Sequence, residues 1–140
     1  ISRYFETYVG VKTFIDQTIS KTQKRQSTRT LFGRHRQIPD INSHNKNLRH
    51  FAQRTAVNSP IQGTAADLIK LAMIQIHHKL KKQHLESKML LQVHDELVFE
   101  VPENELSIMK KLVKKEMEGI YKLLVPLVVD VSIGKNWMKT

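Results

Sequence analysis

The sequence predicts an α+β fold in which mainly helical residues come first and an antiparallel sheet, covered by helices on one face, comes second. In the first part of the chain, apolar side chains recur at intervals of three and four residues, which indicates amphipathic helices. Further on, Leu97, Phe99 and Val101 occupy every second position, and residues 127–133 alternate in the same way. We therefore expect a central hairpin over residues 89–101 and a C-terminal strand in the same sheet.

The first third of the chain is expected to hold two helices and a short hairpin. A helix over residues 1–9 should end at Gly10, and a second helix should run from Val11 into a basic stretch. Residues 28–38 predict a hairpin around Gly33. Because its tip is polar and basic, we expect this hairpin to extend away from the core.

Three further helices are expected around the central hairpin. The first should begin near Asn45 and be interrupted at Pro60, because proline cannot sit undisturbed in a helix interior. Residues 64–67 have the form of a capping box that starts a fresh helix. The last helix should open at Pro102 and end at Pro126. Candidate caps for the helix near Asn45 are Asp40, Asn42 and Ser43.

Composition limits the class of protein. The 140 residues amount to one domain or to part of a larger one, and the start at Ile1 rather than at methionine favours an excised fragment. The absence of cysteine excludes a disulfide scaffold and any thiolate metal site. No apolar run approaches the roughly 20 residues that span a bilayer.

The net charge of +10 is unevenly distributed. Residues 1–54 contain 11 Lys or Arg and 3 acids, a balance of +8, whereas residues 55–140 contain 12 and 10, a balance of +2. All seven arginines lie in the first part, and no acid lies between Asp16 and Asp40. A basic patch rich in arginine is typical of phosphate-backbone binding. A merely solvated surface is the alternative, and a membrane surface is disfavoured because the basic run lacks an apolar face.

The turn of the central hairpin carries an imidazole and two carboxylates, from His94, Asp95 and Glu96. A solvated, charged turn would also explain them, but the flanking runs are apolar enough to form buried strands. Adjacent strand residues point to opposite faces, so we expect Asp95 and Glu96 to have different roles. Mg²⁺ prefers oxygen ligands and usually takes one or two carboxylates together with substrate phosphates. Asp95 is therefore the leading candidate for a catalytic metal ligand.

Two segments resemble motifs of the DNA polymerase I family (family A). Residues 91–100 (LQVHDELVFE) resemble the family's second catalytic carboxylate motif. Residues 54–67 (RTAVNSPIQGTAAD) resemble its segment that follows the primer–template. The similarity runs from residues 3–8 (RYFETY) to residues 134–137 (GKNW), so it covers nearly the whole chain.

The resemblance implies roles for the three turn residues. Asp95 matches the aspartate that binds two Mg²⁺ ions together with an aspartate of an earlier motif, and Glu96 matches a supporting catalytic acid. His94 matches a residue that contacts the primer terminus in the minor groove, although a purely structural turn histidine is the alternative.

The resemblance also implies a DNA-binding surface. Arg54, Asn58 and Gln62 match a row of minor-groove and backbone contacts near the primer end. Their amides suit this task because minor-groove acceptors are similarly placed for every correct base pair; exposed polar residues near a helix break are the alternative. Phosphate contact is assigned to three further residues, Arg29, Arg34 and Arg36.

In terms of the family's architecture, residues 1–48 correspond to the end of the fingers subdomain and residues 49–140 to most of the palm, with its antiparallel sheet. Two motifs of the family are missing from the chain: an Asp-Tyr-Ser-type motif with the other catalytic aspartate, and a basic helix that binds the incoming triphosphate. Both are expected before Ile1, so the two-metal site should be completed by an aspartate outside this chain.

The leading hypothesis is therefore a template-directed DNA polymerase, acting in replication or repair, that transfers nucleotides from dNTP to a primer 3′-hydroxyl with two Mg²⁺ ions. The 140 residues alone are expected to be inactive. Two alternatives stay open: a basic duplex-DNA-binding module without catalysis, and a metal-dependent nuclease that uses Asp95 and Glu96. The expected partners are primer–template DNA and dNTP, with no membrane or protein partner, and a cytoplasmic, nucleoid-associated location is expected if the source is bacterial.

Overall fold

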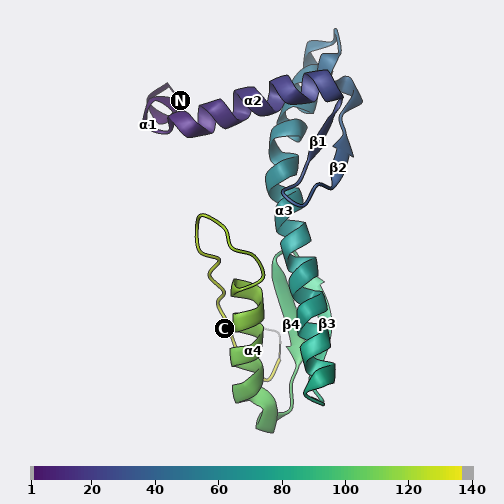
Figure 1. The fold of residues 1–140 in the computed structure, drawn as a ribbon, viewed down its shortest axis with the longest axis vertical. Helices are drawn as coiled ribbons and strands as arrows, with labels where there is room; N and C mark the ends of the chain where they lie inside the picture. The colour runs from purple at the N-terminus through teal and green to yellow at the C-terminus, as the bar shows by residue number, and fades with distance from the viewer. Residues whose placement is uncertain (1, 137–140) are drawn as a thin grey trace. The chain divides into compact units, whose positions relative to one another are not determined.

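The computed structural model describes residues 2–136, the side chain of Ser2 excepted. The chain forms two compact units, Ile1–Asp67 and Leu68–Thr140. In chain order the elements are α1 (Ser2–Thr7), α2 (Val9–Arg25), β1 (Ser27–Arg29), β2 (His35–Gln37), the 3₁₀ helix η1 (Pro39–Asn42), α3 (Lys46–Lys82), β3 (Lys88–Val93), β4 (Glu96–Glu100), the 3₁₀ helix η2 (Glu103–Glu105) and α4 (Leu106–Glu118) (Figure 1).

Helices and two small antiparallel hairpins, β1–β2 and β3–β4, confirm the predicted α+β class. Among the described residues, none of the helices combines the length and the apolar character that crossing a membrane requires. The predicted subdomain boundary between residues 48 and 49 stays a prediction, because the division into compact units does not test it.

The first two helices separate at Tyr8 rather than at the predicted Gly10. Tyr8 leaves helical geometry with φ −112° and ψ 63°, while its ring packs on that of Tyr4 with 5.0 Å between centroids. Gly10 lies inside α2, where glycine is tolerated at a cost of about 1 kcal/mol. At its other end α2 stops at Gln26, whose φ of 50° is left-handed and whose N–H donates to the Thr22 carbonyl.

The β1–β2 hairpin forms around Gly33, as predicted. Its register pairs Ser27 with Gln37 and Arg29 with His35. Gly33 has φ +85°, in the left-handed region that glycine occupies without a steric penalty.

The tip of this hairpin packs against α3, so the prediction that it extends outward is wrong. The Leu31 N–H donates to Thr64 Oγ1 over 2.9 Å. Arg34 Nη2 donates to the Gly63 carbonyl over 3.0 Å. The polar groups of the tip, which were expected to face solvent, thus form hydrogen bonds with α3, some thirty residues away along the chain.

α3 is one continuous helix through Pro60, and the predicted fresh start at residues 64–67 is wrong. The helix begins as expected after Asn45, whose Oδ1 accepts the Asn47 N–H over 2.9 Å. Pro60 removes one backbone donor and costs about 3 kcal/mol in a helix interior. Thr64 does not cap a new helix, because its hydroxyl donates to the Pro60 carbonyl and accepts a hydrogen bond from the β1–β2 hairpin. Tertiary packing therefore outweighs the local signal to stop.

Each unit has its own apolar core. The core of the first unit consists of Ile38, Ile41, Ala52 and Ala56. The core of the second unit consists of Ile76, Leu80, Met109, Leu112 and Val113. Leu97 and Phe99 of β4 pack against this second core, so α4 and the second half of α3 cover one face of the β3–β4 hairpin, as predicted (Figure 1).

The segment after α4 differs from the prediction in two ways. α4 ends at Glu118 with Gly119 as its cap, not at Pro126, and Leu124 is fully exposed, so the apolar stripe does not continue. The predicted strand over residues 127–133 does not form; the alternation is still visible because residues 127, 129 and 131 are half-buried and their neighbours exposed. A strand needs a ladder partner, and this segment instead receives a side chain, with the Val129 N–H donating to Glu118 Oε1 over 3.0 Å.

Glu105 ties the turn after α3 to the start of α4. Its two carboxylate oxygens accept the backbone N–H groups of Glu86 and Ser87, each over 2.9 Å, and the Ser87 hydroxyl donates to it as well. The Ser87 hydroxyl and then these amides lower the pKa of Glu105 below its ordinary value, against the opposing effect of burial. The buried carboxylate thereby holds the segment that leads into β3.

We predict that Glu105→Gln lowers the melting temperature of the chain at neutral pH and removes part of its acid sensitivity. Because the folded chain lowers this pKa, the stabilisation is fully present above the ordinary value of 4.5 and is lost as the pH falls through the lowered value. Thermal unfolding between about pH 7 and about pH 3 checks this, with the exposed Glu103→Gln in the same turn as control. Equal acid sensitivity in Glu105→Gln and in the parent would contradict it.

Candidate active site

In the second unit, the β3–β4 turn presents the predicted catalytic residues. Val93 pairs with Glu96, so His94 and Asp95 form a two-residue loop between the strands. His94 has φ 52°, a left-handed conformation that is uncommon outside glycine. The Gln92 side chain steadies the loop because its Nε2 donates to the His94 carbonyl over 2.8 Å.

Asp95 lies at the exposed tip of a hairpin that packs one face against a helical core. His94 and Glu96 are exposed as well, and Glu96 is already the first residue of β4. A carboxylate held this way is accessible to a ligand while its backbone stays anchored. That the two acids have different roles stays a prediction.

A β-bulge precedes the turn, and sequence reasoning missed it. Met89 pairs with Phe99 and Leu91 with Val98, so Leu90 is the extra residue, and it is half exposed. A bulge bends a strand and changes the direction of the side chains beyond it, and bulges are frequent beside active sites. Nothing in the alternation of residues 89–93 signals it.

The turn offers part of the ligand set of a divalent-metal site, not a complete set. Among the described residues, no group of three or more His, Cys, Asp or Glu side chains is placed to hold a metal ion. Asp95 offers the oxygen ligands that Mg²⁺ prefers, and this ion commonly takes only one or two protein carboxylates. The donor chemistry therefore fits, with Asp95 as the candidate ligand.

In the first unit, the three residues predicted to follow the primer–template lie along α3. Arg54, Asn58 and Gln62 are all exposed and four residues apart, which places them on one face of a helix. Sequence reasoning placed a break within this row, whereas α3 carries all three without interruption.

A hollow of about 60 Å³ brings Gln62 together with the three arginines assigned to phosphate contact. Its lining residues are Thr28, Arg29, Thr30, Arg34, Arg36, Ser59, Gln62 and Gly63. Arg54 and Asn58 are not among them. All the lining residues come from β1–β2 and from the stretch of α3 on which this hairpin packs.

The arginines around this hollow differ in how firmly they are held. Arg36 Nη1 donates to Ser59 Oγ over 3.2 Å. Arg34 has stronger partners, since Nε forms a 2.8 Å ion pair with Asp67 Oδ1 and Nη2 donates to Gly63. Sequence reasoning did not identify Asp67 and Gly63 as partners, because the pairs are separated by 33 and 29 residues.

The two units carry different chemistry. The first has basic and amide side chains suited to a nucleic-acid backbone, and the second exposes a carboxylate turn suited to metal-assisted chemistry. Together they are typical of an enzyme that acts on nucleic acid with the help of a metal ion. The profile of DNA polymerase family A matches residues 1–139. The chain belongs to this family. Polymerases of the family generally depend on metal ions.

Relatives and a solved structure agree with this assignment. DNA polymerase I of Caldicellulosiruptor bescii is 52% identical over 140 residues, which is all of this chain and 16% of that protein. DNA polymerase I of Streptococcus pneumoniae is 51% identical over 98% of this chain and 16% of its own length. The POL domain of Pol1 from M. smegmatis, in complex with DNA primer-template and dNTP, has a TM-score of 0.92 and 43% identity over 96% of this chain and 24% of that one. The chain thus spans about one sixth of the curated relatives it matches.

Proposed function

We propose that this chain supplies a catalytic carboxylate turn and part of the primer–template surface of a template-directed DNA polymerase. The observation that carries the proposal is Asp95, exposed at the tip of an anchored hairpin within a sequence of family A. The reaction joins the primer 3′-hydroxyl to the α-phosphate of a dNTP and releases pyrophosphate, in replication or repair. The partners proposed for this chain, primer–template DNA and dNTP, are those named for its mycobacterial structural neighbour.

The proposed roles divide between the two units. Asp95 would hold Mg²⁺ with Glu96 in support, and an aspartate outside this chain would complete the two-ion site. When bound, the ions supply charge stabilisation for the phosphoryl group and promote ionisation of the attacking hydroxyl. His94, Arg54, Asn58 and Gln62 would contact the primer end, and Arg29 and Arg36 would contact phosphates. Arg34, which the sequence assigns to phosphate contact, instead binds Asp67 and the Gly63 carbonyl. Residues 1–48 are proposed to belong to the fingers and 49–140 to the palm, in a protein of the cytoplasm.

A segment exchange tests the proposal. In this chimera the chain replaces the matching 16% of the C. bescii polymerase, and primer extension is measured with Mg²⁺ and all four dNTPs. We expect template-dependent synthesis. A second chimera that carries the matching S. pneumoniae segment controls for the exchange itself. If the second chimera extends primers and the first binds DNA without extending them, the proposal is wrong.

Asn58→Ala and Gln62→Ala in the chimera are expected to slow extension from a matched primer end by about five- to tenfold each, because each removes a hydrogen bond worth about 1 kcal/mol. Mismatched ends should respond differently, since their groove acceptors are displaced. Single-turnover extension from both kinds of end checks this. Gln75→Ala, an exposed amide elsewhere on α3, is the control. Parent-like extension of both ends by both variants would show that the row does not contact the primer end.

His94→Gly is expected to stabilise the 140-residue chain by up to about 1 kcal/mol, because glycine relieves the left-handed conformation. In the chimera the same change should impair extension, because the imidazole is lost. His84→Gly is the matched control, since His84 has φ 54° in the turn just after α3, in the same unit. It should stabilise the chain equally and leave extension unchanged. If both variants extended primers like the parent, His94 would be a structural turn residue only.

A further inference from the structure

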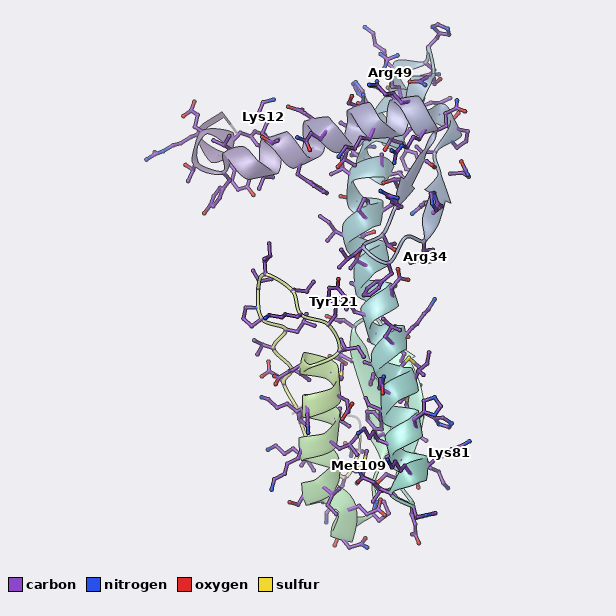
Figure 2. The ribbon with its side chains drawn as sticks, in the orientation of Figure 1. Lys12, Arg34, Arg49, Lys81, Met109 and Tyr121 are labelled. Carbon is purple, nitrogen blue, oxygen red and sulfur yellow. The ribbon has the colours of Figure 1, made fainter. Side chains whose placement is uncertain are left out.

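The Arg34 guanidinium donates two hydrogen bonds inside the first unit. Nε donates to Asp67 Oδ1 over 2.8 Å, and Nη2 donates to the Gly63 carbonyl over 3.0 Å. The Asp67 side chain is only 12% exposed, whereas that of Arg34 is 52% exposed. A charge as poorly hydrated as Asp67 depends on its ion pair more than an exposed charge would. Figure 2 labels Arg34 on the hairpin loop beside α3.

Gly63 allows the β1–β2 hairpin to approach α3 closely enough for Arg34 to reach the Gly63 carbonyl. A Cβ at this position would lie 2.6 Å from Thr30 Cγ2 and 3.3 Å from Arg34 Nη2. The first distance is shorter than real carbon contacts allow, so with a larger residue either the Thr30 side chain or the hairpin would have to shift. Glycine has a poor helix propensity, and its place in the interior of α3 is explained by this packing.

One more hydrogen bond ties the hairpin tip to the helix. The Leu31 N–H donates to Thr64 Oγ1. Within the tip, the Arg34 N–H donates to Thr30 Oγ1 over 3.2 Å, and the Thr30 N–H donates to the Arg34 carbonyl over 2.9 Å. The tip is therefore a closed loop that donates two hydrogen bonds to Gly63 and Thr64 of α3, one from the Arg34 guanidinium and one from the Leu31 amide.

We propose that Arg34 is a positioning residue rather than a phosphate ligand: with Asp67 and the Gly63 carbonyl it forms a latch that docks hairpin β1–β2 on α3. The latch holds the hairpin in the position that forms the hollow lined by Arg29, Arg36 and Gln62. It thereby determines the orientation in which these side chains contact nucleic acid. The choice of nucleic acid as ligand rests on the proposed function, but the latch itself does not.

Amide hydrogen exchange of Leu31, followed by NMR in the 140-residue chain, reports docking without DNA. We expect Arg34→Gln and Asp67→Asn each to speed this exchange by about two- to fivefold, as for loss of a partly exposed ion pair. The double variant should be no faster than the faster single one, because both break one contact. Arg29→Gln, in the same hollow, is the control. Unchanged exchange in both single variants overturns the latch, whatever the polymerase assays give.

DNA binding separates the two roles of Arg34. If Arg34 positions the hairpin, Asp67→Asn weakens binding of a primer–template duplex as Arg34→Gln does. If Arg34 is a phosphate ligand, Arg34→Gln lowers the salt dependence by about one counterion, while Asp67→Asn leaves affinity equal or higher because it removes a negative charge. The second pattern overturns the proposal.

A steric pair gives an independent test. Gly63→Ala should speed Leu31 exchange even though alanine improves helix propensity by about 1 kcal/mol, because its Cβ collides with Thr30 Cγ2. Thr30→Ser removes that methyl and keeps the hydroxyl, so Gly63→Ala with Thr30→Ser should restore slow exchange. Gly10→Ala, whose Cβ would meet nothing within 4 Å, is the control. Slow exchange in Gly63→Ala alone, or no rescue by Thr30→Ser, overturns the close-packed latch.

Discussion

Replacing Asp95 by alanine in the chimera is expected to lower nucleotide incorporation at least about a thousandfold, since a metal ion contributes several kcal/mol to the transition state and about 4 kcal/mol corresponds to three orders of magnitude. DNA affinity should change little, because phosphate contacts from basic side chains supply most of it. The hairpin should keep its fold, since Asp95 lies in the exposed loop and contributes nothing to the core of the second unit.

Rapid-quench primer extension and a DNA titration on the same variant measure the two quantities. Glu100→Ala is the matched control, because Glu100 is an exposed acid at the other end of the same hairpin. Glu96→Ala should fall between the two variants, as expected for a supporting acid. Incorporation by Asp95→Ala within a few-fold of the parent would place the metal-binding carboxylate elsewhere.

Ile76→Ala is expected to lower the unfolding free energy of the chain by about 2–5 kcal/mol, the range for truncating a large buried aliphatic side chain. Ile76 is fully buried, at 0% exposure, in the core against which Leu97 and Phe99 of β4 pack. The cavity should loosen the hairpin that carries Asp95, so amide exchange in β3 and β4 should speed up together with the loss of stability.

Urea unfolding and amide exchange measure these effects. Ile74→Ala is the control, because Ile74 lies two residues away on the same helix and is 54% exposed. It should cost well under 1 kcal/mol. Equal losses in the two variants would show that the apolar core does not hold this unit.

Asp95 illustrates how far sequence reasoning reaches into the site. The alternation in residues 97–101 predicts the hairpin, which is confirmed. Of the three polar residues predicted at the turn, His94 and Asp95 form its loop, and Glu96 is already the first residue of β4. The left-handed φ of His94, the brace from Gln92 and the bulge at Leu90 were not predicted. A positive φ is part of the geometry of a two-residue hairpin loop, and the period of two encodes neither the length of this loop nor the bulge.

The sequence itself determined the α+β class, the two hairpins and the family. Periodicity, turn glycines and motif spacing are all visible in residues that lie close together along the chain. Tertiary structure alone decided that α3 continues through Pro60, that α4 stops at Glu118 and that residues 127–133 form no strand. It also decided the partners of Arg34 and Glu105, which lie 33 and 18 residues away along the chain. Such contacts depend on which surfaces the folded chain brings together, and the residues that flank a position in the sequence do not indicate its distant partners.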